Sequence, residues 1–389
     1  MALIPNELVA AILDELDRDY TSLKRCSVVS TAFCSPSQRH LFRSIWIHRG
    51  DWHAYTVAQQ AVHRGTTTPA GTIIGAHSLF QRSPHLASYI RDLAIDLPNA
   101  GDEDITLKHV LRTMPNLERL LISGMTVPWG DLSPGLRSVI LSILAQPTLD
   151  RLHLLNMRSV PVSVLLRMLP SMRALSIHRT TFRDDSPEIL ELPLTSRLEH
   201  ITISTNMRST YKLILPHTPG LTNVTKAHIF IDFFSCMGPE KLLAGLGGTL
   251  QHLVLDCDRL YYPFSLPLLP VLRAVELRVS NGSKRCMPDG LAGTLAGLPR
   301  VPLKIVFGIS DRPFEQGWDE ESSFPGIADW KLEDIHCELL FQDEDDPATL
   351  SMRDAAFGHF CVAIRNAMPG FHVRLSRVDN DLSYVARLP

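Results

Sequence analysis

The stretch Leu117-Glu118-Arg119-Leu120-Leu121-Ile122 recurs as Leu149-Asp150-Arg151-Leu152-His153-Leu154, and this pattern decides the fold. Each copy places one apolar residue three positions before a pair of apolar residues that are separated by a single position. Alternation with a period of two predicts a short strand with one buried face. The apolar residue three positions earlier falls at the turn that leads into the strand.

Further copies of this motif occur along the chain. Seven triplets fit it: Ile90/Leu93/Ile95, Leu117/Leu120/Ile122, Leu149/Leu152/Leu154, Met172/Leu175/Ile177, Leu198/Ile201/Ile203, Leu250/Leu253/Leu255 and Leu272/Val275/Leu277. A weaker copy, Leu221/Val224/Ala227, misses the last step. Successive copies are 22 to 32 residues apart, which is in or near the period of leucine-rich repeats. One such unit cannot bury its own apolar face, so the motif predicts a curved solenoid with a parallel sheet.

A helix is expected before each strand, as at 110–114 and 163–169. Prolines would end these helices at positions 115, 147, 170 and 270. An ordinary doubly wound sheet is the rival fold, and it would need longer strands and a phosphate-binding glycine loop. Gly245-Leu246-Gly247-Gly248 is not such a loop, because no Gly-x-Gly-x-x-Gly pattern or Lys-Ser/Thr follows it.

Three short helices and a strand are predicted in the first 48 residues. Residues 5–16 have an amphipathic pattern, with Pro5 suited to a first turn. Thr21 or Ser22 could cap a second helix, and Ser35-Pro36 is a start signal for a third. Residues 45–47 (Ile-Trp-Ile) read as a strand. A unit of this size buries little apolar surface, so it should depend on the rest of the chain or on a partner.

These helices resemble the F-box family. Ile4-Pro5-x-Glu7-Leu8 is similar to its Leu-Pro-x-Glu-Leu/Ile opening, and Val29-Ser30-x-x-Phe33 is similar to its Val-Cys-x-x-Trp. Leu16-Asp17 falls at the Leu-Asp step, and residues 23–30 and 36–45 resemble the version common in mushroom-forming fungi. Ile4 stands where the family has Leu, and Phe33 where it has Trp. Both replacements keep bulk and apolar character.

The resemblance implies a substrate receptor of a Skp–cullin–F-box ubiquitin ligase, without catalytic chemistry of its own. Apolar helix positions would dock in a groove of the Skp-type adaptor, and through it to a cullin. Carried over by position, the anchors are Ile4, Pro5, Leu8, Ile12, Leu16, Leu23, Val29 and Phe33. The alternative for inner positions is packing within the three helices. A second hypothesis is a protein-binding scaffold whose F-box-like unit does not engage a ligase, and it is motivated by Ile4 and Phe33.

Composition excludes several other classes of protein. Net charge is −3 and aromatic residues are 7% of the chain, so neither nucleic acid nor an anionic membrane is favoured as a partner. The seven cysteines lack Cys-x-x-Cys spacing, which argues against a disulfide framework and a zinc ribbon. No apolar run is long enough to span a membrane. The N-terminal residues do not resemble a signal peptide, so we expect the cytosol, the nucleus or both.

No catalytic, metal or cofactor site is predicted. The sequence contains no Gly-x-Ser-x-Gly, His-Glu-x-x-His, P-loop or dinucleotide motif, so a hydrolase on an α/β scaffold has no support. Adjacent His336 and Cys337 would point apart on a strand. No arginine cluster stands out as a phosphate reader. The sequence does not identify the target protein.

The predicted fold class is therefore α/β (α+β overall), with five segments. They are an F-box-like helical domain at 1–48, a connector helix and polar linker at 49–84, the repeat solenoid at 85–310, an acidic insertion or loop at 311–350, and a C-terminal helix and strand cap at 351–389. Residues 311–350 contain 13 acidic and 2 basic side chains. That imbalance predicts a solvated loop or a recognition surface for a basic partner.

Overall fold

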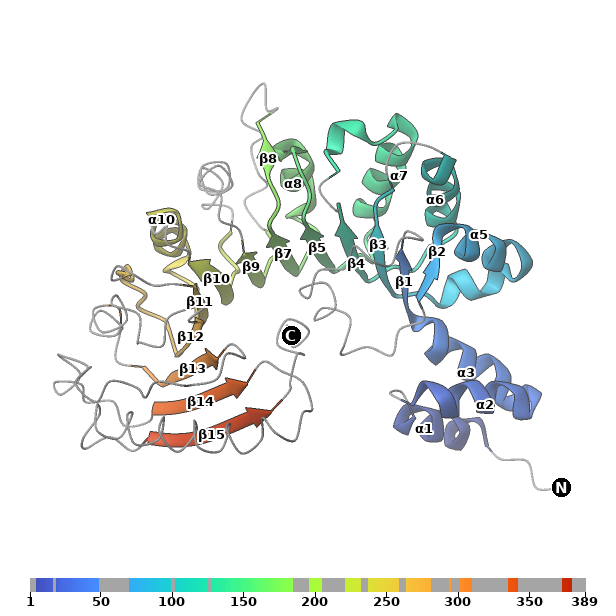
Figure 1. The fold of residues 1–389 in the computed structure, drawn as a ribbon, viewed down its shortest axis with the longest axis horizontal. Coiled ribbons are helices and arrows are strands. Elements are labelled where there is room, and N and C mark those ends of the chain that lie inside the picture. The colour runs from blue at the N-terminus through green and yellow to red at the C-terminus, as the bar shows by residue number, and fades with distance from the viewer. Residues whose placement is uncertain are drawn as a thin grey trace. The chain divides into compact units, whose positions relative to one another are not determined.

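The computed structural model describes residues 5–16, 19–48, 70–98, 102–124, 127–184, 196–204, 221–231, 237–258, 264–280, 294, 301–309, 335–341 and 373–379. It is a mixed α/β fold built on long ladders of parallel strands (Figure 1). The chain divides into two compact units. The described residues up to 184 belong to the first unit, and those from 196 to 379 belong to the second.

The first unit begins with three helices and continues into a sheet. Its elements are α1 (Asn6–Glu15), α2 (Tyr20–Val29), α3 (Thr31–Arg43), β1 (Ser44–His48), β2 (Ala70–Thr72), α5 (Ile73–Arg82), η2 (Pro84–Tyr89), β3 (Asp92–Asp96), α6 (Asp102–Arg112), β4 (Arg119–Ser123), η3 (Trp129–Asp131), α7 (Pro134–Leu144), β5 (Arg151–Leu155), β6 (Val160–Pro161), α8 (Val162–Met168), β7 (Ala174–His178) and β8 (Phe182–Arg183). Its strand order is β2-β1-β3-β4-β5-β7, all parallel. The short strands β6 and β8 pair separately.

The second unit is a ladder of parallel strands in sequence order. It contains β9 (His200–Ser204), β10 (Lys226–Ile231), α10 (Met237–Leu246), β11 (His252–Asp258), β12 (Ala274–Ser280), β13 (Leu303–Ile309), β14 (Ile335–Phe341) and β15 (Val373–Asp379). Each strand pairs with the next one along the chain. A right-handed crossover connection is the usual route between such strands.

The repeated motif supplies one strand per copy, as predicted. The register pairs Leu93, Leu120, Leu152 and Leu175 in one row across β3, β4, β5 and β7. All four of these leucines are at most 2% exposed. A second row pairs Ile95, Ile122, Leu154 and Ile177 in the same way, and these residues are also buried. The period of two therefore gives each strand one core face.

Helices cover this core face in the first unit. Figure 1 shows α5, α6, α7 and α8 following one another along one side of the sheet. α5 packs on α6 and α6 packs on α7. Leu136, Ile140 and Leu144 of α7 are buried, at the i, i+4, i+8 spacing of one helix face. Ser133 begins α7 by accepting a hydrogen bond from the Leu136 N–H at 3.1 Å.

Several predicted boundaries differ from the structure. Asp19, not Thr21 or Ser22, caps α2: its side chain accepts the Ser22 N–H at 2.9 Å. Hydrogen bonds from the Ser22 side chain and the Ser22 backbone lower the pKa of the Asp19 carboxyl group. α3 begins at Thr31, so Pro36 lies inside the helix instead of starting it. Pro36 has no N–H and therefore donates no hydrogen bond to the preceding turn. The residues before Pro36 nevertheless form a helical turn.

The proposed linker at 49–84 also differs at its end. Residues 49–69 lie outside the described part of the chain, but β2 pairs in parallel with β1 and is followed at once by α5. Ala70-Gly71-Thr72 shows no apolar alternation, so the pattern gave no sign of a strand. The predicted strand at 45–47 is confirmed as β1, and it is part of the sheet because it pairs with β3.

Three details of the repeats are corrected. The weak copy is shifted by three residues, from Leu221/Val224/Ala227 to Val224/Ala227/Ile229, because Ala227 pairs with Ile201 and Ile229 pairs with Ile203. Pro270 does not follow a helix, since residues 264–269 belong to no helix or strand. Within the predicted acidic loop at 311–350, residues 335–341 form β14. Of the predicted C-terminal helix and strand cap at 351–389, the structure describes residues 373–379, which form β15.

Gly124, just after β4, is expected to tolerate no larger side chain. A Cβ atom there would lie 2.7 Å from Met157 Sδ and 2.9 Å from the Asn156 carbonyl oxygen. Gly124→Ala should therefore lower the free energy of unfolding by about 1–3 kcal/mol, the usual cost of overpacking. Urea denaturation followed by circular dichroism would measure it. Gly130→Ala is the matched control, because a Cβ there meets nothing within 4 Å, and equal effects would contradict the prediction.

Candidate functional site

The three N-terminal helices share a small core of their own. Val9 and Leu13 of α1, Leu23 of α2 and Leu41 of α3 are buried together. Partly buried residues pack around them: Leu16, Tyr20, Cys26, Phe33 and Phe42. This core fixes which side of each helix faces inward, and therefore which apolar side chains remain on the outside.

The predicted adaptor-binding residues fall into two groups. Leu23 is only 2% exposed, and Leu16 and Phe33 pack against the core, so these three hold the helices together. By contrast, Leu8 is 56% exposed, Ile12 46% and Val29 72%. Pro5 is exposed, and its carbonyl accepts the N–H groups of the first turn of α1. Ile4 lies outside the described residues.

Exposed apolar side chains therefore gather on two helices. Leu8 and Ile12 are four residues apart on α1, so they lie on the same helix face. Val28 and Val29 end α2, and Val28 is 82% exposed. Sequence reasoning did not select Val28, although two adjacent valines at a helix end cannot both face a core. Single exposed apolar residues are ordinary, whereas contiguous apolar patches mark interaction surfaces.

α3 joins the three helices to the sheet. It ends at Arg43 and β1 begins at Ser44. Its middle also packs on η2, where the Ser35 and Tyr89 hydroxyls are 3.2 Å apart and the Arg39 guanidinium lies 5.6 Å from the centre of the Tyr89 ring. The Arg91 N–H donates to the Arg43 carbonyl at 2.8 Å. The helices are thus fastened to the first strands by backbone and side-chain contacts.

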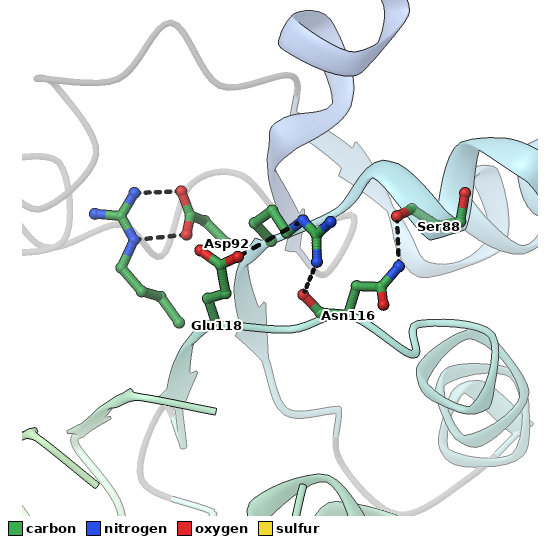
Figure 2. Close-up of polar contacts among 6 residues, drawn as sticks. Ser88, Asp92, Asn116 and Glu118 are labelled. Carbon is green, nitrogen blue, oxygen red and sulfur yellow. Dashed lines mark hydrogen bonds and ion pairs between the residues drawn. The ribbon is translucent and has the colours of Figure 1, made fainter. Parts of the chain in front are cut away.

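A polar network lies where β3 and β4 begin (Figure 2). Arg91 lies 3.7 Å from Glu118 and donates to the Asn116 carbonyl at 3.2 Å. The Asn116 amide donates in turn to the Ser88 carbonyl at 2.9 Å. Beside this group, Arg119 forms a two-pronged pair with both carboxylate oxygens of Asp92. These bonds hold Arg91 and Arg119 in fixed positions.

The strand face opposite the core carries polar side chains in both units. In the first unit, His153 lies on this face, and burial together with the positive charges of Arg119 and Arg151 lowers its pKa to about 4. In the second unit, His228 Nε2 lies 2.5 Å from Asp256 Oδ2. Arg278 Nε lies 2.7 Å from Glu276 Oε1 and 3.8 Å from Asp256 Oδ1. Polar and charged groups on the neighbouring strands β10, β11 and β12 thus form a row in the second unit.

The described residues contain no group of three or more His, Cys, Asp or Glu side chains that could hold a metal ion. Within the same parts of the chain, no helix is long and apolar enough to cross a membrane. The cysteines Cys26 and Cys34 are partly buried free thiols, and Cys257 is buried. His336 and Cys337 occupy consecutive positions of β14.

No protein-family model matches this chain, and no curated protein matches it.

Proposed function

We propose that the chain is the substrate-receptor subunit of a Skp–cullin–F-box ubiquitin ligase. The observation that carries this proposal is the pairing of a small helical core with exposed apolar residues on α1 and α2. Leu8 and Ile12 point away from the core that Val9 and Leu13 build, so they are free to enter a groove on an adaptor. The resemblance of residues 4–33 to an F-box supports the same partner.

The repeated strands support the second half of the proposal. We take the two ladders as a degenerate leucine-rich-repeat solenoid, because each motif copy adds one parallel strand in constant register. The polar face of the strands would hold the target protein, with the charged row of the second unit as one candidate contact. The receptor would then act by proximity, because it raises the effective concentration of a target lysine near the ubiquitin-loaded enzyme.

Co-expression with a Skp-type adaptor tests the adaptor contact. The wild-type chain should co-purify with the adaptor, and Leu8→Asp should reduce the captured adaptor at least tenfold, since truncating a central anchor costs about 2 kcal/mol or more. The carboxylate would be exposed in the free chain but desolvated in the complex. Pro5→Ala should weaken binding less, because it removes only part of one apolar contact.

Ile105→Asp is the matched control. Ile105 is 54% exposed on α6, almost the same as Leu8, but it lies outside the three N-terminal helices. It should leave adaptor capture unchanged. Circular dichroism should show that all variants are folded. A folded wild-type chain that captures no adaptor would overturn the proposal and favour the alternative, a protein-binding scaffold without a ligase. Capture that survives Leu8→Asp would overturn the assignment of Leu8.

A further inference from the structure

A cleft opens between the second half of α3 and the first strands of the sheet. Its volume is about 510 Å³, which is within the size range of small-ligand sites. The lining residues come from three separate segments: Arg39, His40, Arg43, Ser88, Tyr89, Arg91 and Glu118. The three-helix core and the exposed apolar residues of α1 and α2 are not part of this lining.

The lining of the cleft is positively charged. Arg39 and Arg43 are four residues apart on α3, so their side chains leave the same face of the helix. Arg91 adjoins them, because its N–H is bonded to the Arg43 carbonyl at 2.8 Å. Among the lining residues that the structure describes, three guanidinium groups face the cleft with one carboxylate, Glu118. Leaving His40 out of the sum, these residues carry an excess of two positive charges.

Two of these arginines lack an acidic partner. Arg119 shows what such a partner looks like, because Asp92 accepts both prongs of its guanidinium. In the parts of the chain that the structure describes, no carboxylate pairs with Arg39 or Arg43. Arg39 instead lies over the Tyr89 ring. Stacking of this kind orients a guanidinium but leaves its N–H groups able to donate.

Arg91, the third arginine of the cleft, is held in place by polar contacts. Glu118, the Asn116 carbonyl and, through Asn116, Ser88 fix its position (Figure 2). Its guanidinium therefore need not lose much side-chain entropy when a ligand binds. One anchored arginine and two arginines that pair with no carboxylate of the described residues can surround an anion that offers several oxygen atoms.

We propose that this cleft binds a dianionic phosphomonoester group. Guanidinium groups bind phosphate oxygens with two parallel hydrogen bonds, and two negative charges would neutralise the excess charge of the lining. The group could be carried by a phosphorylated side chain of another protein or by a small phosphorylated compound. The inference goes beyond adaptor binding and does not depend on it, because the cleft shares no residue with the proposed adaptor surface.

Calorimetric titration of the full chain with inorganic phosphate tests the proposal, at pH 7.5 and with sodium chloride adjusted to constant ionic strength. We expect saturable binding with one site per chain. Arg43→Gln and Arg39→Gln should each weaken it roughly tenfold or more, the effect of losing a hydrogen bond to a charged group. Arg39→Lys keeps the positive charge but loses the two parallel N–H donors of the guanidinium. It should therefore weaken phosphate binding less than Arg39→Gln.

Arg112→Gln is the matched control, because Arg112 is an exposed arginine in the last turn of α6, as Arg43 is in the last turn of α3. It should leave phosphate binding unchanged. A short peptide with one phosphoserine, compared with its unphosphorylated form, identifies the source: tighter binding than inorganic phosphate indicates a phosphorylated protein, and equal binding indicates a small compound. Absence of saturable binding to either probe would overturn the proposal. Phosphate binding that is unchanged in Arg39→Gln would also overturn the proposal, because Arg39 is exposed and its replacement should not disturb the fold.

Discussion

Leu120→Ala should lower the free energy of unfolding by about 2–5 kcal/mol, the range for removing a fully buried leucine from a close-packed core. Leu120 is 1% exposed and lies in the middle of the row formed by Leu93, Leu152 and Leu175. The cavity would lie between the neighbouring leucines of this row. Strand pairing fixes their positions, so they cannot easily move to fill it. Urea denaturation followed by far-ultraviolet circular dichroism would measure the loss.

Leu121→Ala is the matched control for this prediction. Leu121 is the same residue type in the same strand, but it faces away from the core and is partly exposed. The loss there should stay below about 1.5 kcal/mol, because less apolar surface is buried. If Leu121→Ala cost as much as Leu120→Ala, the assignment of the core face of β4 would be wrong.

His153 should make the protein less stable in acid. Its folded pKa is about 4, while the unfolded chain has the ordinary value near 6.5. Between these values the unfolded state binds a proton that the folded state does not, so stability falls as pH drops from about 6.5 toward 4. At 1.36 kcal/mol per pKa unit, the shift from 6.5 to about 4 corresponds to at most about 3 kcal/mol. Because part of the residue remains accessible, we expect a smaller effect of about 2 kcal/mol.

His153→Gln isolates this contribution from that of the carboxylates. Between pH 7.5 and pH 4.5, the wild-type chain should lose about 2 kcal/mol more unfolding free energy than the variant does. Urea denaturation at the two pH values gives both numbers. Identical pH dependence in His153→Gln and wild type would refute the role of His153.

Most of the sheet could be predicted because its signal is local. The alternation of apolar residues around Leu120, Leu152 and Leu175 predicts a strand at each position. Parallel stacking follows because one repeat cannot bury its own apolar face. The signal fails where the chain lacks it. Ala70-Gly71-Thr72 has no alternation, and becomes β2 only because it adjoins β1. Because Ala227 has a small side chain, the sequence pattern did not identify it as the middle residue of its triplet.

The candidate sites were less predictable because they depend on tertiary contacts. α1 has two adjacent apolar stripes, Leu8/Ile12 and Val9/Leu13, and helical periodicity alone cannot tell which one faces the core. The structure buries Val9 and Leu13. Arg39 and Arg43 are far from Arg91 in the sequence, so no arginine cluster is visible there. Only the docking of α3 on η2 and β3 brings them to one cleft.

The direct step from α3 to β1 limits how this chain can change length. Arg43 is the last residue of the helix and Ser44 is the first of the strand, so the joint contains no spare residue. One residue inserted there would have to be absorbed by the helix end, or it would move Ile45 and Ile47 to the wrong face of the sheet. Insertions between the three helices and the strands should therefore be tolerated poorly.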